Sequence, residues 1–209
     1  MGLKVLLING SPRKHGNTFA ALSEIAKSLE AAGVGSEIEW IGVKPVRGCI
    51  ACGKCKANGN NRCVFDDDLC NQVSGKMRDF DAVVIGSPVY YGQPNGTLLC
   101  LVQRMLYSAG AHFAGKPVAC VAVCRRGGAT AALQSLQMPF QLLHMPIVTS
   151  QYWNIVYGRT EGEAALDSEG MQTMRSLAKN MAYILSATDG KARPEYEPWQ
   201  PMHFIRVEN

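Results

Sequence analysis

The sequence predicts an α/β domain in which a doubly wound, five-stranded parallel sheet, in the strand order 2-1-3-4-5, carries helices on both faces. Short, continuous apolar runs alternate with longer segments of helical periodicity, as expected for strands that are covered on both sides. Five such strand–helix units follow one another, and 209 residues suit a single domain with one core. A sheet of this kind binds ligands at the carboxyl ends of strands one, three and four.

Each element follows from a local pattern. The runs expected as strands span residues 3–8, 38–43, 81–86, 118–124 and 146–149. Helical spacing of apolar residues predicts helices over 19–29, 66–77, 97–107, 130–143 and 166–184. Asp66–Asp68 suit the start of the second helix, where carboxylates accept free amides, and this interpretation is preferred to a metal site. The domain is expected to span 1–187 with a cysteine-rich insertion at about 44–65, followed by an extended tail, 188–209, packed on the domain or on a neighbouring subunit.

Composition excludes several classes of function. A net charge of +4 is spread along the chain, so no basic groove for nucleic acid is expected. No apolar run reaches the length of a membrane span, and the first apolar run is too short for a secretory signal. We therefore expect a cytoplasmic protein. Its eight cysteines are then expected as thiols or metal ligands and not as disulfides.

The loop after the first strand, Gly10–Thr18, has the chemistry of a phosphate cradle. Its glycines let backbone amides approach a ligand, and the helix that follows offers free N–H groups. The loop lacks the Gly-Lys-Ser/Thr ending of a P-loop and the GxGxxG pattern of a dinucleotide site. The alternative is a turn whose hydroxyls only cap the helix. The donors available to an anion are Ser11, Arg13, Asn17 and Thr18.

Two further loops are expected at the same edge of the sheet. Ser87–Gly96 combines polar and aromatic residues, which can line a flat heterocycle. After the fourth strand, Arg125, Arg126 and Gly127 offer charge and flexibility for a reduced flavin or for the phosphates of a nicotinamide cofactor. The alternatives are tyrosines packed under a surface loop and a solvated turn. The convergence of three distinctive loops favours a common ligand.

Gly-Ser-Pro-Arg-x-x-Gly-Asn-Thr after the first strand, together with Gly-Ser-Pro-Val-Tyr-Tyr after the third, resembles the flavodoxin-like NADPH-dependent FMN reductase family over about residues 1–187. The resemblance implies that Ser11, Arg13, Asn17 and Thr18 contact the FMN phosphate. It also implies NAD(P)H as co-substrate and a homodimer or homotetramer. The residues implied to line the ribityl chain and the ring are Pro88, Val89, Tyr90, Tyr91 and Gly92, with Arg125, Arg126 and Gly127 beside them.

The insertion carries the pattern Cys49-x2-Cys52-x2-Cys55-x7-Cys63. Three cysteines at three-residue steps can bind three corners of a 4Fe–4S cluster, and a later cysteine can bind the fourth. Zinc usually takes two CxxC pairs that lie further apart, and reduced thiols without metal are a third interpretation. The segment resembles the cysteine motif of iron–sulfur flavoproteins, in which a 4Fe–4S cluster lies beside FMN. The cations expected to offset the cluster charge are Arg47, Lys54, Lys56 and Arg62.

These features predict an FMN-dependent oxidoreductase that passes electrons between NAD(P)H and a flavin, quinone or one-electron acceptor such as ferredoxin, with a 4Fe–4S cluster as intermediate carrier. The cofactors supply the chemistry, and no catalytic side chain is assigned because the four histidines are isolated. Two alternatives remain open at this stage. One is a non-enzymatic flavin and iron–sulfur electron carrier, and the other is a zinc-knuckle binding module.

Overall fold

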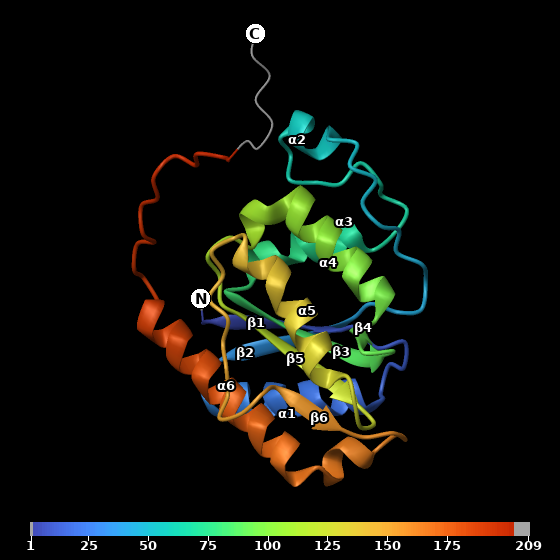
Figure 1. Ribbon diagram of the computed structural model, residues 1–209. Coiled ribbons are helices and arrows are strands. Elements are labelled where there is room, and N and C mark those ends of the chain that lie inside the picture. The colour runs from blue at the N-terminus through green and yellow to red at the C-terminus, as the bar shows by residue number, and fades with distance from the viewer. Residues whose placement is uncertain (1, 203–209) are drawn as a thin grey trace.

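The computed structural model describes residues 2–202 and has the predicted doubly wound architecture (Figure 1). Its strands are β1 (Lys4–Asn9), β2 (Gly35–Trp40), β3 (Ala82–Tyr90), β4 (Gln93–Pro94), β5 (Val118–Cys124) and β6 (Ile155–Tyr157). The α-helices are α1 (Asn17–Ala31), α2 (Lys54–Asn58), α3 (Cys70–Lys76), α4 (Gly96–Ala109), α5 (Ala129–Gln141) and α6 (Ser168–Thr188). Short 3-10 turns lie at Met77–Asp79, Gly110–His112 and Glu163–Leu166.

The strand order confirms the predicted topology. The main path through the sheet is β2-β1-β3-β5-β6, and every pair along it is parallel. This is the predicted order 2-1-3-4-5, because the two-residue strand β4 only pairs antiparallel with the end of β3. Parallel neighbours bring the carboxyl ends of β1, β3 and β5 to one edge of the sheet.

Three boundaries in the sheet differ from the prediction, and the second helix, predicted over 66–77, is the shorter α3, which begins at Cys70. The fifth strand of the path is Ile155–Tyr157 and not 146–149, where Ile147 makes only an isolated bridge to Val118. The second strand lies at Gly35–Trp40, so it begins and ends three residues before the predicted 38–43. The expected loop 87–96 is in large part a hairpin, since β3 continues to Tyr90 and turns back into β4.

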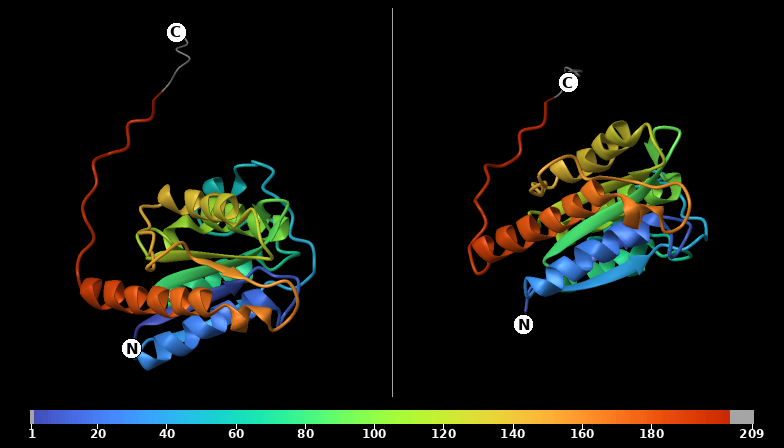
Figure 2. Two further views of the ribbon diagram at one scale, coloured as in Figure 1. Left: turned by 60° about the horizontal axis from the view of Figure 1, so that its bottom comes forward. Right: turned by 90° about the horizontal axis from the view of Figure 1, so that it is seen from below.

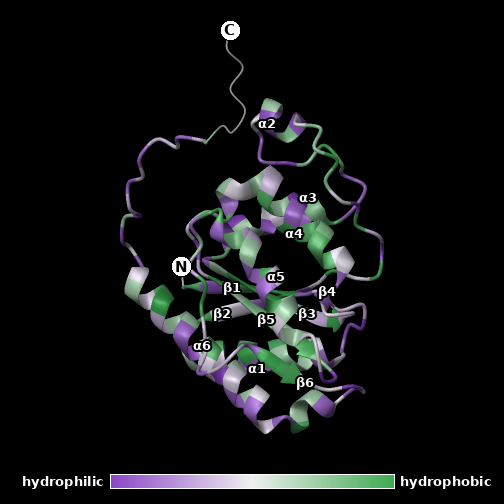
Figure 3. Ribbon diagram, viewed as in Figure 1, coloured by the Kyte–Doolittle hydropathy of each residue, from purple (hydrophilic) through white to green (hydrophobic). Residues whose placement is uncertain are grey.

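Helices cover both faces of the sheet, and each face has its own core. Helices α1 and α6 pack side by side on one face, and Figure 2 shows this pair running along the sheet. Helices α3, α4 and α5 cover the other face. Alternate residues of β1 divide between the cores: Leu6 and Ile8 face α4, whereas Val5 and Leu7 face α1. Hydropathy follows this division, with largely hydrophobic central strands and mixed helix surfaces (Figure 3).

The chain just after β1 lies against the middle of β3. The amide of Gly10 donates to the carbonyl of Gly86 at 2.8 Å. A Cβ at Gly10 would lie 2.5 Å from Leu98 Cδ2 and 2.8 Å from that same carbonyl, so no side chain fits there. A Cβ at Gly86 would lie 3.0 Å from Thr18 Cγ2. Glycine at both positions therefore lets the loop after β1 lie directly against β3.

The insertion and the tail lie outside the two helical layers. The insertion leaves the sheet after β2, carries α2 and returns through α3, over the side of the molecule that α4 covers (Figure 1). The described part of the tail has no regular structure; it touches the domain through stacking of Tyr196 on His144 at 4.2 Å and through Arg193, which donates to the carbonyl of Ala114. Residues 203–209 of the predicted tail lie outside the described residues. No described helix combines the length and the apolar character that a membrane span requires.

We expect Gly10→Ala to lower the free energy of unfolding by about 1–3 kcal/mol, because the added methyl group overpacks the junction of β1 and β3. Gly96→Ala is the matched control, since nothing lies within 4 Å of its added Cβ, and its stability should be unchanged or slightly higher. Urea unfolding followed by circular dichroism measures both. Equal stabilities of the two variants would contradict the proposed close packing.

Candidate functional site

Helix α1 begins with free amides at the predicted phosphate loop. Its N-cap residue, Gly16, provides no side-chain acceptor, and within residues 2–202 no acceptor is found for the amides of Asn17 and Thr18. Helices α4 and α6 differ, because Asn95 and Asp167 accept their first-turn amides. A helix start without a cap has a partial positive charge and binds anions.

The side chains of the first loop have unequal roles. Ser11 and Thr18 are buried, and the Ser11 hydroxyl accepts from the amide of Arg13 at 3.1 Å, which leaves its own proton free to donate. The Arg13 side chain is exposed and has no ion-pair partner among the described residues. Trp40, the last residue of β2, holds the loop in place through its Nε1, which donates to the carbonyl of Ser11 at 2.7 Å.

Asn17 does not offer its side chain freely to a ligand. Its Nδ2 donates to the carbonyl of Thr160 at 2.8 Å, and its Oδ1 accepts from the amide of Ala164 at 3.2 Å. Gly158 leaves room for this contact, because a Cβ there would lie 2.7 Å from Nδ2. The Asn17 side chain therefore ties the predicted phosphate loop to the segment after β6, and its backbone amide is left without an acceptor among the described residues.

The second loop is a two-residue turn with an unusual backbone. Tyr90 pairs with Gln93, and the residues between them, Tyr91 and Gly92, have φ values of 51° and 74°. Positive φ at both central positions is the type I′ hairpin turn, which favours Asn or Gly and disfavours a tyrosine. The Tyr91 side chain is also fully exposed, at 106%. The turn therefore holds an exposed aromatic ring in a disfavoured backbone conformation at the end of β3.

The third loop touches the second. A Cβ at Gly128, where φ is 86°, would lie 2.7 Å from Gly92 Cα and 3.4 Å from Val89 Cγ1. The structure thus brings the loops after β3 and β5 into contact, while Pro88 and Val89 are half-buried at the end of β3. Arg125, Arg126 and Gly127 are exposed.

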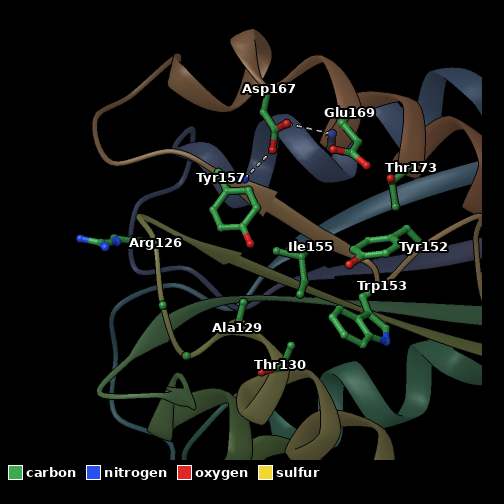
Figure 4. A pocket seen from close by; sticks show the side chains of 13 residues that line it. Arg126, Ala129, Thr130, Tyr152, Trp153, Ile155, Tyr157, Asp167, Glu169 and Thr173 are labelled. Carbon is green, nitrogen blue, oxygen red and sulfur yellow. Dashed lines mark hydrogen bonds between the residues drawn. The ribbon is translucent and has the colours of Figure 1, made fainter.

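Beside the third loop lies a cavity of about 270 Å³ at the carboxyl end of β6 (Figure 4). Its walls carry three half-exposed aromatic residues, Tyr152, Trp153 and Tyr157. The figure shows the Tyr157 hydroxyl directed into the space and the Arg126 side chain directed away from it. Partial burial raises the pKa of Tyr157 above its usual value, so its hydroxyl stays protonated at neutral pH and can donate. This aromatic wall was not predicted, because Tyr152 and Trp153 lie on an irregular segment between α5 and β6 and Tyr157 lies in β6, the strand that the sequence pattern misplaced.

Asp167 fixes one side of this cavity. One carboxylate oxygen accepts from the amide of Gly170 at 2.9 Å and the other from the amide of Tyr157 at 2.7 Å. Both oxygens are therefore occupied in joining the start of α6 to β6. Glu169, in the first turn of α6, is the remaining carboxylate of the cavity wall.

All four cysteines of the predicted metal motif, Cys49, Cys52, Cys55 and Cys63, line one cavity. They do not meet at one point: within residues 2–202 no three side chains of His, Cys, Asp or Glu are grouped closely enough to hold a metal ion. The rest of the wall is mostly contributed by the insertion and by α4, through Ile50, Gly53, Val64, Phe65, Arg104, Tyr107 and Ser108.

Two local contacts fix the chain at these cysteines. Ala51 has φ of 52°, and its amide donates to Cys49 Sγ at 3.4 Å. Buried Asn71 holds the distant Cys63: its Oδ1 accepts from the amide of Cys63 at 2.8 Å, and its Nδ2 donates to the carbonyl at 3.0 Å. Asn71 thus brings the fourth cysteine of the motif to the other three across the long spacer.

Arg104 of α4 is fully buried against this cavity, with 1% of its side chain exposed. Its guanidinium forms an ion pair with Asp68, which is 5% exposed, and donates to the carbonyls of Arg47 and Phe65. Its Nε has no partner among the described residues. Arg104 was not predicted as a site residue, because it stands in an apolar helix and its partner lies 36 residues earlier in the chain.

The acidic triplet has a further role besides starting a helix. Asp68 accepts from the amide of Cys70 at 3.0 Å, at the start of α3, which agrees with the prediction. The other two carboxylates form exposed ion pairs, Asp66 with Arg62 and Asp67 with Arg47. Arg47 and Arg62, expected to offset the charge of a cluster, are thus paired with acids at the surface, where each pair is worth little.

Comparisons with known proteins find flavoproteins. The model of the NADPH-dependent FMN reductase family matches residues 3–160. The chain is 31% identical over 192 residues to an iron–sulfur flavoprotein of Methanocaldococcus jannaschii, with 88% of this chain and 97% of that protein covered. It is 29% identical over 189 residues to an iron–sulfur flavoprotein of Methanosarcina thermophila, with 88% and 95% covered.

Solved structures support the fold. RosB with bound 8-demethyl-8-formylriboflavin-5′-phosphate superposes with a TM-score of 0.68 at 14% identity and covers all of both chains. A flavodoxin from the domain Archaea gives a TM-score of 0.58 at 12% identity, covering 88% of this chain and 99% of its own. At these identities the likeness concerns the fold, which is flavodoxin-like as predicted.

The turn at Tyr91 gives a test of the site that needs no ligand. We expect Tyr91→Asn to raise the free energy of unfolding of the flavin-free protein by about 1 kcal/mol, because asparagine tolerates positive φ. Tyr91→Ala is the control, since it removes the ring but keeps a Cβ in the disfavoured conformation, and it should bring no such gain. Equal stabilities of these two variants in urea unfolding would show that the turn is not strained.

Proposed function

The chain belongs to the NADPH-dependent FMN reductase family, and from this premise we propose that it is an FMN-dependent oxidoreductase that transfers electrons from NAD(P)H. The observation that supports this proposal best is that three loops lie together at one edge of the sheet. The phosphate loop contacts β3, and the hairpin at the end of β3 contacts the loop after β5. Bound FMN supplies the redox chemistry by taking two electrons from a nicotinamide and releasing them singly or in pairs.

The first loop would hold the FMN phosphate. The free amides of Asn17 and Thr18, the Ser11 hydroxyl and the exposed Arg13 form a set of donors that suits a dianion at a helix start. The side chain of Asn17 keeps the loop in place through the segment after β6. The protein therefore has its anion-binding groups in place before the ligand arrives.

The second and third loops would hold the ring. Val89 and the Tyr91–Gly92 turn offer an apolar wall and backbone groups, and Gly128 lets the third loop lie against them. The aromatic cavity beside Gly127 suits a second flat substrate, a nicotinamide or a quinone, with the protonated Tyr157 hydroxyl as its hydrogen-bond donor. Arg125 and Arg126 are exposed nearby, where the phosphates of a nicotinamide cofactor would reach solvent.

The four-cysteine cavity would hold a 4Fe–4S cluster as the carrier to a one-electron acceptor such as ferredoxin. Four thiols around one cavity, with no histidine in its wall, match the ligand set of a cubane. Binding requires the four sulfurs to move toward the middle of the cavity. The exposed Cys49 and Cys52 lie on the irregular part of the insertion, where such a movement disturbs no helix or strand. Exposed Tyr91 suits contact with a neighbouring subunit in a homodimer or homotetramer.

The phosphate assignment predicts a preference for FMN over riboflavin. Arg13→Ala should weaken FMN binding roughly 10- to 100-fold, the effect of one lost hydrogen bond to a charged group, and leave riboflavin binding unchanged. Arg175→Ala, which removes an arginine paired with Glu24 on the far face, is the control. Flavin fluorescence titration gives the affinities. Anaerobic reduction of the bound flavin by NADH or NADPH tests the enzymatic part, and reduction by neither would leave a simple electron carrier.

The proposed cluster site predicts which cysteines the protein needs in order to retain iron. After anaerobic reconstitution with ferrous iron and sulfide, Cys55→Ser and Cys63→Ser should lose most of the iron and sulfide, because each removes a thiolate ligand. Cys100→Ser should retain both, since Cys100 does not line the cavity. Iron, sulfide and zinc assays give the result. Stoichiometric zinc without iron in the wild-type protein would replace the cluster by a zinc site.

A further inference from the structure

The buried arginine of helix α4 calls for an explanation beyond stability. A buried ion pair contributes little to folding, because removing both charges from water costs about as much as their attraction returns. The Arg104–Asp68 pair is nevertheless almost completely buried, and one polar group of it, the Nε–H of Arg104, stays without an acceptor among the described residues. A buried donor with no acceptor is costly, so such a group is expected to serve a ligand.

The position of the pair is asymmetric with respect to the four-cysteine cavity. Arg104 lines that cavity together with all four cysteines, whereas Asp68 does not. The carboxylate also has its second oxygen engaged with the amide of Cys70. The positive end of the pair therefore faces the thiols, and the negative end faces the start of α3.

Within residues 2–202 none of the other basic residues expected near the motif is held in this way, and Lys54 is exposed. Lys56 extends over the ring of Tyr107 at 5.1 Å and is exposed, and Arg47 and Arg62 are exposed and paired with Asp67 and Asp66. Charges at the surface are screened by water and salt, while a buried charge acts at nearly full strength over a short distance. Among the residues described, Arg104 is the buried cation in the wall of this cavity.

We propose that Arg104 is the positioning residue and counter-ion of the group that the four cysteines hold, and that its Nε–H donates to a sulfur of that group. The proposal rests on the proposed function, because it takes the cavity to be the 4Fe–4S site. Its consequence is that Arg104 raises the reduction potential of the cluster. Reduction adds one electron and makes the cluster more negative, so a nearby buried positive charge stabilises the reduced form.

The test compares three variants of the full-length chain, reconstituted anaerobically with iron and sulfide and carrying FMN. Arg104→Lys keeps the charge but loses the Nε donor and the planar fork. Arg104→Gln with Asp68→Asn removes both charges together, so that no carboxylate is left buried alone. Arg175→Gln removes an arginine on the far face of the molecule and is the control. The readouts are the iron and sulfide content and the reduction potential of the cluster, followed by electron paramagnetic resonance.

We expect the double variant to shift the cluster potential to more negative values, Arg104→Lys to shift it less in the same direction, and Arg175→Gln to leave it unchanged. The FMN affinity should stay constant in all three, which reports that the domain is folded. Potentials of both Arg104 variants equal to that of the wild type would overturn the role of Arg104 while the cluster site stands. A wild-type chain that takes up no iron and sulfide would overturn the cluster site itself, and the proposal with it.

Discussion

The close approach of β1 and β3 is the constraint on which the rest of the site depends. β1 ends at Asn9, which pairs with Gly86 in the middle of β3; the amide of Gly10 continues this pairing, and Thr18 of α1 packs on Gly86. The helix start and the hairpin therefore share one edge of the sheet before any ligand is bound. A methyl group at Gly10 would overlap the side chain of Leu98 and the carbonyl of Gly86. The junction therefore requires the absence of a side chain at this position, in addition to hydrophobic burial.

Helix α4 connects the two candidate cofactor sites. It begins at Gly96, next to the hairpin, and its residue Arg104 reaches the four-cysteine cavity eight positions later, about 12 Å along the helix axis. Asn95 caps its first turn, and its inner face packs into the core on that side of the sheet. A flavin at the edge of the sheet and a cluster in the insertion, as proposed above, would thus lie near two parts of the same helix.

Patterns that are local in sequence could be predicted, and those that depend on distant pairing could not. The apolar runs of β1, β3 and β5 and the three loops after them are continuous signals, and the structure has them where they were expected. The last strand was misplaced because two short apolar segments compete for β5: the segment around Ile147 meets its beginning and Ile155–Tyr157 meets its end. Strands this short carry no distinguishing periodicity. The engagement of the Asn17 side chain with Thr160 likewise depends on a contact across 143 positions of the chain.

The charges around the cysteines show the same limit. Counting basic residues near the motif selects Arg47, Lys54, Lys56 and Arg62, yet all four are exposed, and the two arginines are paired with the exposed carboxylates of Asp67 and Asp66. The third carboxylate, Asp68, pairs with Arg104 of α4, and both side chains of this pair are buried. The electrostatic effect of a cation on the thiols of the cavity therefore depends on its burial and not on its distance along the sequence. Solvent weakens the field of the surface ion pairs far more than that of the buried pair. Among the described residues, the thiols of this basic insertion therefore face one buried cation, Arg104, whose charge is partly balanced by Asp68 outside the cavity wall.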